Sequence, residues 1–211
     1  MTEIERKLLE VLQKKNVLKD ELMSKHTSFK IGGKAEFFIK VTSVRELKHV
    51  LKISNEYNIP IQIIGNGTNL LVLDSGIKGF VVKLEMNNFK VKKTIKESFI
   101  IAESGLALSK LSNIAIKEEL EGLEFLSGIP GTVGGGIRMN AGAYGKEMKD
   151  IVVKTKYMTY DGKIKNLELE EHEFKYRDSI FSKMDGIIIE TTIKANKGNK
   201  KEIEKKNKRV F

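Results

Sequence analysis

Two spacings of hydrophobic residues follow one another along the chain and predict a mixture of helices and strands. Apolar residues recur at helical intervals in three stretches, the first two of which open with the Ser/Thr-to-Glu spacing of a capping box: residues 2–12, 43–51 and 107–118. We expect an N-terminal helix within residues 1–20. The third helix is expected to stop at Gly122, because glycine is favoured just after the end of a helix.

Short apolar runs between turn residues predict strands. The runs are IQII (61–64), LLVL (70–73), FVVKL (80–84), FIIA (99–102) and GIIIETTIKA (186–195). Asp161–Gly162 lies between two further runs, and we expect a β-hairpin there because Asp-Gly favours the left-handed turn that matches strand twist. The chain is therefore expected to be α+β, with a small helix-and-strand unit followed by a larger β-rich unit.

Two glycine-rich segments interrupt this pattern. One separates IQII from LLVL at Gly65–Asn69, and the other, Ser127–Glu147, is expected to be irregular and contains seven glycines. Backbone amides freed by glycine can converge on an anion such as phosphate. Neither segment fits a standard nucleotide motif, because Leu70 stands where G-x-G-x-x-G needs its third glycine and no Gly-Lys step is followed by Ser or Thr.

The glycines could instead serve only turns and close packing, which is the simpler explanation for either segment alone. Two such segments together, with Asn66, Asn69 and Asn140 as additional side-chain donors, favour a bound ligand with phosphate groups.

Composition excludes several other classes of protein. The 211 residues contain no Cys, which excludes thiol chemistry and Cys-based metal sites, and the three His residues match no metal-ligand spacing. The net charge of +10 is concentrated in residues 194–211, where eight basic and two acidic residues contribute +6, so we expect a solvated tail and no nucleic-acid partner. No stretch is long and apolar enough for a signal peptide or a membrane span, so a cytoplasmic protein without a membrane partner is expected.

Four motifs occur in an order and spacing that resemble one known family. They are HTSFKIGG, IGNGTNLLVLDSG, GIPGTVGGGIRMNAGAYG and YRDSIF, and they span about residues 20–195. This combination resembles the UDP-N-acetylenolpyruvoylglucosamine reductases, also called UDP-N-acetylmuramate dehydrogenases. The resemblance implies a two-subdomain FAD-binding fold of the vanillyl-alcohol-oxidase (PCMH) type, with FAD between subdomains formed by residues 21–85 and 86–195.

The resemblance also implies which residues contact FAD. The first segment would cradle the pyrophosphate through Gly65, Asn66, Gly67, Thr68 and Asn69, and the second would line the rest of the cofactor through Pro130, Gly131, Gly134, Gly135, Asn140, Ala141, Gly142, Ala143 and Tyr144. For Tyr144, a position beside the flavin and a place in the core remain alternatives.

Arg177 is the residue to which the resemblance assigns chemistry, and Tyr176 is expected to contact substrate. A guanidinium is permanently charged and forked, so it can hold a carboxylate and stabilise negative charge as it develops. The alternative is a surface arginine paired with Asp178 or Asp185, which would add little to stability.

The implied reaction is the NADPH-dependent, FAD-mediated reduction of the enolpyruvyl ether of UDP-N-acetylglucosamine to UDP-N-acetylmuramate, a nucleotide sugar of peptidoglycan synthesis. Family members continue into a third domain with a proton-donating serine and an assisting glutamate, so residues 196–211 would be a basic linker toward an absent domain. Ser179 belongs to the arginine motif and is not assigned the proton. The alternative function is a non-catalytic FAD-binding module that cannot complete turnover.

Overall fold

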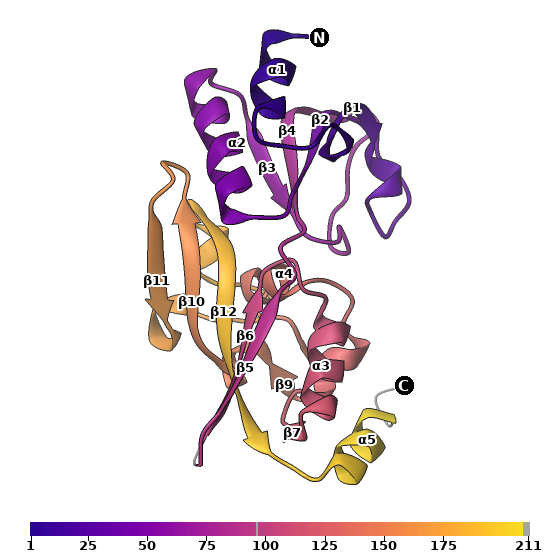
Figure 1. Ribbon diagram of the computed structural model, residues 1–211. Coiled ribbons are helices and arrows are strands. Elements are labelled where there is room, and N and C mark those ends of the chain that lie inside the picture. The colour runs from indigo at the N-terminus through magenta and orange to yellow at the C-terminus, as the bar shows by residue number, and fades with distance from the viewer. Residues whose placement is uncertain (96, 209–211) are drawn as a thin grey trace. The chain divides into compact units, whose positions relative to one another are not determined.

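A computed structural model of the chain describes residues 1–95 and 97–208 (Figure 1). Its internal contacts divide the chain into two compact units. Unit 1 consists of Met1–Met86 together with Tyr160–Lys163, and unit 2 consists of Asn87–Thr159 together with the residues from Ile164 onward.

Unit 1 is built on a four-stranded sheet in the order β1-β2-β4-β3. β1 (Val17–Leu22) is antiparallel to β2 (Lys34–Val41), whereas β4 (Ile77–Leu84) is parallel to both β2 and β3 (Ile61–Ile64). The central strand β4 contains the consecutive buried residues Phe80–Val82, a run typical of a strand that is covered on both faces.

The helices of unit 1 begin at the predicted capping residues. α1 (Glu3–Leu9) has both reciprocal bonds of a capping box between Thr2 and Glu5, and the Ser43 hydroxyl accepts from the Glu46 amide at the start of α2 (Val44–Glu56). α2 connects the parallel strands β2 and β3, as a crossover between parallel strands requires. Two 3-10 turns complete the unit: η1 (Lys14–Asn16) and η2 (Met23–Lys25).

The N-terminal helix is shorter than the sequence pattern predicted. It covers only Glu3–Leu9, and residues 17–20 of the expected 1–20 helical stretch belong to the edge strand β1. The pairing of Val17 with Ile39 and of Leu18 with Phe38 explains this difference, because a sheet edge is available there to accept a strand.

The prediction of a strand at LLVL, residues 70–73, was wrong. Val72 packs into the core with Phe38 and Val81, but Leu71 and Leu73 are 63% and 71% exposed and the segment joins no sheet. Its backbone is held by a loop, since Gly33 donates to the Leu73 carbonyl at 3.0 Å. The side chains of this segment therefore alternate between buried and exposed as in a strand, although the segment pairs with no strand.

Unit 2 is built on an antiparallel sheet whose main path runs β11-β10-β12-β6-β5. The strands are β5 (Phe89–Lys93), β6 (Ser98–Glu103), β10 (Val152–Thr159), β11 (Ile164–Glu168) and β12 (Gly186–Lys197), with β7 (Leu120–Glu121) paired to the end of β12. The Asp161–Gly162 hairpin and the final strand are confirmed, and Gly162 has the left-handed φ of +82° that its turn requires.

The helices of unit 2 pack on this sheet through one large hydrophobic core. Leu111 of α3 (Leu108–Lys117) and Ile137 of α4 (Val133–Arg138) are fully buried with Ile100 and Ile193 of the sheet. The remaining short elements are η3 (Glu124–Gly128), β8 (Gly142–Ala143), β9 (Lys146–Glu147), η4 (Met148–Asp150), η5 (Leu169–His172) and η6 (Ile180–Ser182).

Three further expectations about unit 2 are corrected. α3 ends at Lys117 and not at Gly122, because Glu119 takes the left-handed conformation and Leu120–Glu121 pair with β12. The segment 127–147, expected to be irregular, contains α4 and the β8–β9 hairpin.

The third correction concerns residues 196–211, which were expected to form a solvated linker. They continue β12 to Lys197 and then form α5 (Lys200–Lys208), where Ile203 is 1% exposed. The Asn199 side chain accepts from the Lys201 amide at 3.0 Å and so begins the helix. Residues 209–211 of this stretch lie outside the described residues.

A buried histidine ties η5 to the sheet of unit 2. His172 has no exposed surface, and its ring nitrogens contact the Glu168 carbonyl and the Thr155 hydroxyl, each at 2.8 Å. Burial lowers the pKa of His172 below its ordinary value, and this effect exceeds the opposing effect of the backbone hydrogen bonds. The folded chain therefore keeps the imidazole neutral under conditions in which the unfolded chain protonates it.

We expect this histidine to make unfolding pH-dependent. Because its pKa is lower in the folded than in the unfolded chain, its contribution is complete above about pH 6.5 and decreases as the pH falls below that value. The loss can reach about 1.4 kcal/mol per pH unit for one proton. Urea unfolding from pH 8 to pH 5 should show this component in the wild type and not in His172→Gln.

Thr155→Val is the matched control for this measurement, because it removes the hydroxyl partner but keeps the titrating ring. It should lower stability and retain the pH dependence. Equal pH dependence in the wild type and His172→Gln would contradict the assignment.

Candidate functional site

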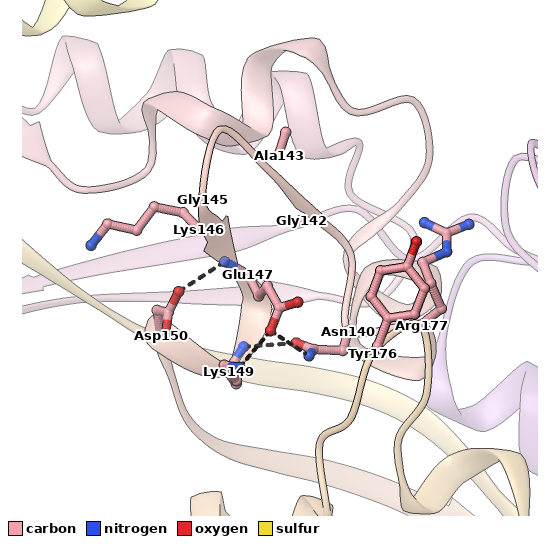
Figure 2. Close-up of a pocket in the computed structure, with 10 residues that line it drawn as sticks. All are labelled: Asn140, Gly142, Ala143, Gly145, Lys146, Glu147, Lys149, Asp150, Tyr176 and Arg177. Atoms are coloured by element: carbon pink, nitrogen blue, oxygen red, sulfur yellow. Dashed lines mark hydrogen bonds and ion pairs between the residues drawn. The ribbon is translucent and has the colours of Figure 1, made fainter.

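A polar pocket of about 710 Å³ lies in unit 2 (Figure 2). It is lined by two segments that are separated in the sequence: residues 140–150, which contain the β8–β9 hairpin, and the adjacent residues Tyr176 and Arg177. The predicted substrate and catalytic residues therefore lie at the same pocket as Asn140, Gly142 and Ala143 of the predicted cofactor segment.

The β8–β9 hairpin forms one wall of the pocket. Its two-residue turn, Tyr144–Gly145, has left-handed φ values of +55° and +76°, as a type I′ turn requires. Gly142 is required by the hairpin itself, since a Cβ there would lie 2.6 Å from the Lys146 carbonyl oxygen. The Tyr144 side chain is 67% exposed, which excludes the alternative that it is a core residue.

A short turn carries Tyr176 and Arg177. Lys175 and Asp178 pair on either side of it, with N···O distances of 3.1 and 3.3 Å, and Arg177 has a left-handed φ of +54°. Tyr176 is 86% exposed, and Figure 2 shows its ring beside the Arg177 guanidinium on the same side of the pocket. The turn thus presents both side chains at its tip.

Ser179 follows this turn but does not reach the pocket. It is 2% exposed, and its hydroxyl donates to the Arg138 carbonyl at 2.9 Å. The structure thus gives Ser179 a role in holding the segment in place.

Asn140 connects the two walls. Its side-chain nitrogen donates to a Glu147 carboxylate oxygen and to the Lys175 carbonyl, each at 3.0 Å, and its side-chain oxygen accepts from the Lys149 amide at 3.1 Å. The residue is 1% exposed. The predicted contribution of this side chain to a ligand is therefore replaced by contacts within the protein.

Charge in the pocket is partly neutralised. The ion pair with Lys149, at 2.7 Å, is the main reason that the pKa of Glu147 is lowered, and donation from Asn140 adds to it. Figure 2 shows that Lys146 extends away from the Tyr176 and Arg177 side chains. Arg177 is therefore the cation placed to meet an anionic group beside Tyr176.

The glycine segment around α4 shows features that fit an approaching ligand. Gly135 is exposed, and a Cβ there would meet its nearest neighbour, the Thr132 hydroxyl, at 3.6 Å, so packing does not require glycine. Next to it, Gly134 donates to the Ser104 carbonyl at 2.8 Å. The buried Ser104 hydroxyl is one of three buried side-chain atoms without a hydrogen-bond partner in the part of the chain that is described. The Gly135 amide donates to the Thr132 hydroxyl at 3.4 Å, so what this segment offers a cofactor is an exposed backbone surface that no side chain covers.

The Gly65–Asn69 loop of unit 1 is held by the protein itself. Gly67 has a left-handed φ of +64°, and a Cβ there would lie 2.0 Å from the His26 carbonyl oxygen. Its own carbonyl accepts from the Ser28 amide at 3.1 Å. Glycine at this position is required by the fold, whatever the loop binds.

Sequence reasoning missed several residues of these sites. Glu147 and Lys149 line the pocket as an ion pair, and Ser104 adjoins the α4 glycines. No sequence motif marked them; only the short distance of Glu147 and Lys149 from the glycine run could have drawn attention to them.

Residues 1–95 and 97–208 contain no group of three or more His, Cys, Asp or Glu side chains arranged to hold a metal ion. No helix among them has the length and hydrophobicity needed to cross a membrane.

Comparison with known proteins places the chain in a family. Residues 35–168 match the family model described as FAD binding domain. The chain is 45% identical over 197 residues to the UDP-N-acetylenolpyruvoylglucosamine reductase of Clostridioides difficile. That match covers 93% of this chain and 64% of the relative. It is 40% identical over 206 residues to UDP-N-acetylenolpyruvoylglucosamine reductase 2 of Bacillus cereus. That match covers 98% of this chain and 67% of the relative.

The chain belongs to the UDP-N-acetylenolpyruvoylglucosamine reductase family.

Comparison with solved structures supports the assignment of the chain to this family. The UDP-N-acetylenolpyruvylglucosamine reductase of Thermus caldophilus superimposes with a TM-score of 0.79 at 32% identity, over 92% of this chain and 67% of that one. p-Cresol methylhydroxylase superimposes with a TM-score of 0.65 at 16% identity, which shows the fold alone. The α+β fold is thus the predicted FAD-binding fold of the vanillyl-alcohol-oxidase (PCMH) type. The chain spans 63–64% of the length of two clostridial members of the family.

We expect Gly67→Ala to destabilise the chain whether or not a ligand is present. The substitution combines an unfavourable φ with overlap against the His26 carbonyl, so the free energy of unfolding should fall by about 3 kcal/mol or more. Gly145→Ala is the matched control, because Gly145 is also left-handed but has no heavy atom within 4 Å of its Cβ position. It should cost about 1 kcal/mol.

Both free energies are measured by urea unfolding of the cofactor-free chain. Equal losses in the two variants would show that the His26 carbonyl yields to the new Cβ and that the loop is not rigidly held.

Proposed function

We propose that the chain binds FAD and reduces UDP-N-acetylglucosamine enolpyruvate, with NADPH as the hydride donor, in cytoplasmic peptidoglycan synthesis. The observation that carries this proposal is the presentation of Arg177 and Tyr176 at one polar pocket by a short turn in which Arg177 has a left-handed φ, in a chain of this family. The substrate is a small nucleotide sugar, and the two predicted FAD-binding subdomains are proposed to correspond to units 1 and 2.

The residues proposed to hold FAD form two groups. The pyrophosphate is assigned to Gly65, Asn66, Gly67, Thr68 and Asn69. The remaining contacts are assigned to Pro130, Gly131, Gly134, Gly135, Asn140, Ala141, Gly142, Ala143 and Tyr144, where the Asn140 side chain holds the segment in place. FAD, when bound, supplies the acceptance and donation of hydride. The exposed backbone at Gly135 and the unsatisfied Ser104 hydroxyl support this assignment.

Arg177 is proposed to act on the enolpyruvyl group of the substrate. Its guanidinium holds the carboxylate in a bidentate geometry and stabilises the negative charge that develops on the substrate as hydride adds to the vinyl carbon. Tyr176, exposed beside it, contacts the substrate. A permanently charged group suits this role because it needs no protonation step of its own.

The first experiment is the visible spectrum of the purified chain, with the released cofactor identified by mass, followed by an assay of substrate-dependent NADPH oxidation. Bound FAD and substrate-dependent oxidation support the proposal. Bound FAD without oxidation would support the alternative, a FAD-binding module that does not turn over. A chain that binds no FAD under any reconstitution condition would contradict both.

We expect Arg177→Lys to leave FAD bound but to slow substrate reduction. Lysine keeps the charge but loses the forked geometry, so oxidation of pre-reduced flavin by the substrate should slow by about 10²- to 10³-fold. Rapid mixing measures this rate directly. Arg45→Lys, at an exposed arginine of α2, is the control and should leave the rate unchanged. An unchanged rate in Arg177→Lys would refute the role of Arg177.

We expect Gly135→Ala to separate FAD binding from stability. Alanine fits the space and favours the helical conformation, so the cofactor-free chain should gain about 0.5–1 kcal/mol. The same methyl group should hinder the cofactor and weaken FAD binding by about tenfold, which flavin fluorescence titration measures. Undiminished FAD affinity would show that the exposed backbone at Gly135 is not a cofactor contact.

A further inference from the structure

The carbonyl of Lys175 is the point at which the Tyr176–Arg177 turn is fixed. It accepts two hydrogen bonds, one at 3.3 Å from the Asp178 amide, which closes the turn, and one at 3.0 Å from the Asn140 side chain. The second bond comes from a different segment of unit 2, so it links the turn to that segment.

Asn140 suits this position through its side chain and its backbone. The carboxamide offers two donors and an acceptor, and these are matched to Glu147, the Lys175 carbonyl and the Lys149 amide. Its φ is +40°, a conformation that asparagine adopts more readily than most residues. Aspartate would place an acceptor against the Glu147 carboxylate and the Lys175 carbonyl, so both contacts would become repulsive.

Other contacts hold the segment on either side of the turn. His172 anchors the residues before it and Ser179 the residues after it. The Asn140 bond ties the turn itself to the hairpin wall, because the same carboxamide also contacts Glu147 of β9.

We propose that Asn140 is a positioning residue that sets the Tyr176–Arg177 turn against the β8–β9 hairpin, so that Arg177 meets the substrate carboxylate. The inference rests on the proposed function. It assigns Asn140 no contact with substrate; the residue acts through the Lys175 carbonyl, whose turn carries Arg177.

The test compares Asn140→Asp with Asn58→Asp. Asn58 is also left-handed, with a φ of +51°, and lies exposed at the end of α2, so the control makes the same substitution on a similar backbone. FAD affinity is measured by flavin fluorescence. Affinity for UDP-N-acetylglucosamine enolpyruvate is measured on the FAD-loaded chain from the change that the substrate causes in the flavin absorbance spectrum, which requires no turnover.

We expect Asn140→Asp to weaken substrate binding by about 10- to 100-fold, because a displaced Arg177 loses its geometry with the carboxylate. FAD affinity should fall by a smaller factor than substrate affinity, since the Lys175 contact fixes the turn that carries Arg177 and not the remaining residues assigned to FAD. Asn58→Asp should change neither. A merely structural role would instead lower both affinities together, and that result, or unchanged substrate affinity, would overturn the proposal.

Failure of the proposed function is recognised separately. If the wild-type chain binds FAD but the substrate causes no spectral change, the assigned substrate is wrong, and positioning is then tested by hydrogen exchange of the amides of residues 176–178. Exchange at least about tenfold faster in Asn140→Asp than in Asn58→Asp supports positioning, and equal exchange overturns it. Asn140→Gly, which removes the carboxamide but favours the same φ, replaces Asn140→Asp in every measurement if the aspartate variant does not fold.

Discussion

The carboxamide of Asn140 joins its own segment to Lys175, 35 residues later in the sequence, since it donates to the Lys175 carbonyl while its oxygen accepts from the Lys149 amide. The pocket exists in its present form because these bonds are buried and saturated. A buried polar group without partners would be costly, so the hairpin and the turn stabilise one another through the group that they share. The large hydrophobic core beneath supports this arrangement but cannot specify it, because apolar contacts are not directional.

Local signals in the sequence predicted local structure well. The Thr2–Glu5 capping box, the Ser43 cap and the Asp161–Gly162 hairpin are all present, because each depends on residues a few positions apart. The prediction of a strand at LLVL was wrong for the opposite reason. Its alternation is real, with Val72 buried between exposed neighbours, but whether a strand forms depends on a partner that the segment itself does not specify.

The end of α3 and the presence of α5 could not be predicted either, because they depend on contacts with distant parts of the chain. α3 stops at Lys117 because the following residues pair with a strand some 75 positions later, a contact that no local pattern contains. α5 forms in a stretch whose composition resembles a solvated tail, since one apolar residue, Ile203, is buried there. The polar network of the pocket likewise could not be predicted, because Asn140, Glu147 and Lys149 are ordinary polar residues in or just after a glycine-rich run, and their partners come from the folded chain. The motif resemblance did bring Tyr176 and Arg177 together with that run, and they lie at one pocket.

Glycines that look alike in the sequence are under different constraints in the structure. Gly67 is required by a neighbouring carbonyl and Gly142 by its own hairpin, whereas no atom of the protein crowds the Cβ position of Gly135. This difference affects how the sequences of relatives should be compared. A descendant that gave up its ligand would still be selected to keep glycine at position 67, but position 135 would be free to drift toward alanine. With Gly135 as the proposed FAD contact, the residue at position 135 would record the history of binding, whereas the residue at position 67 records only the history of the fold.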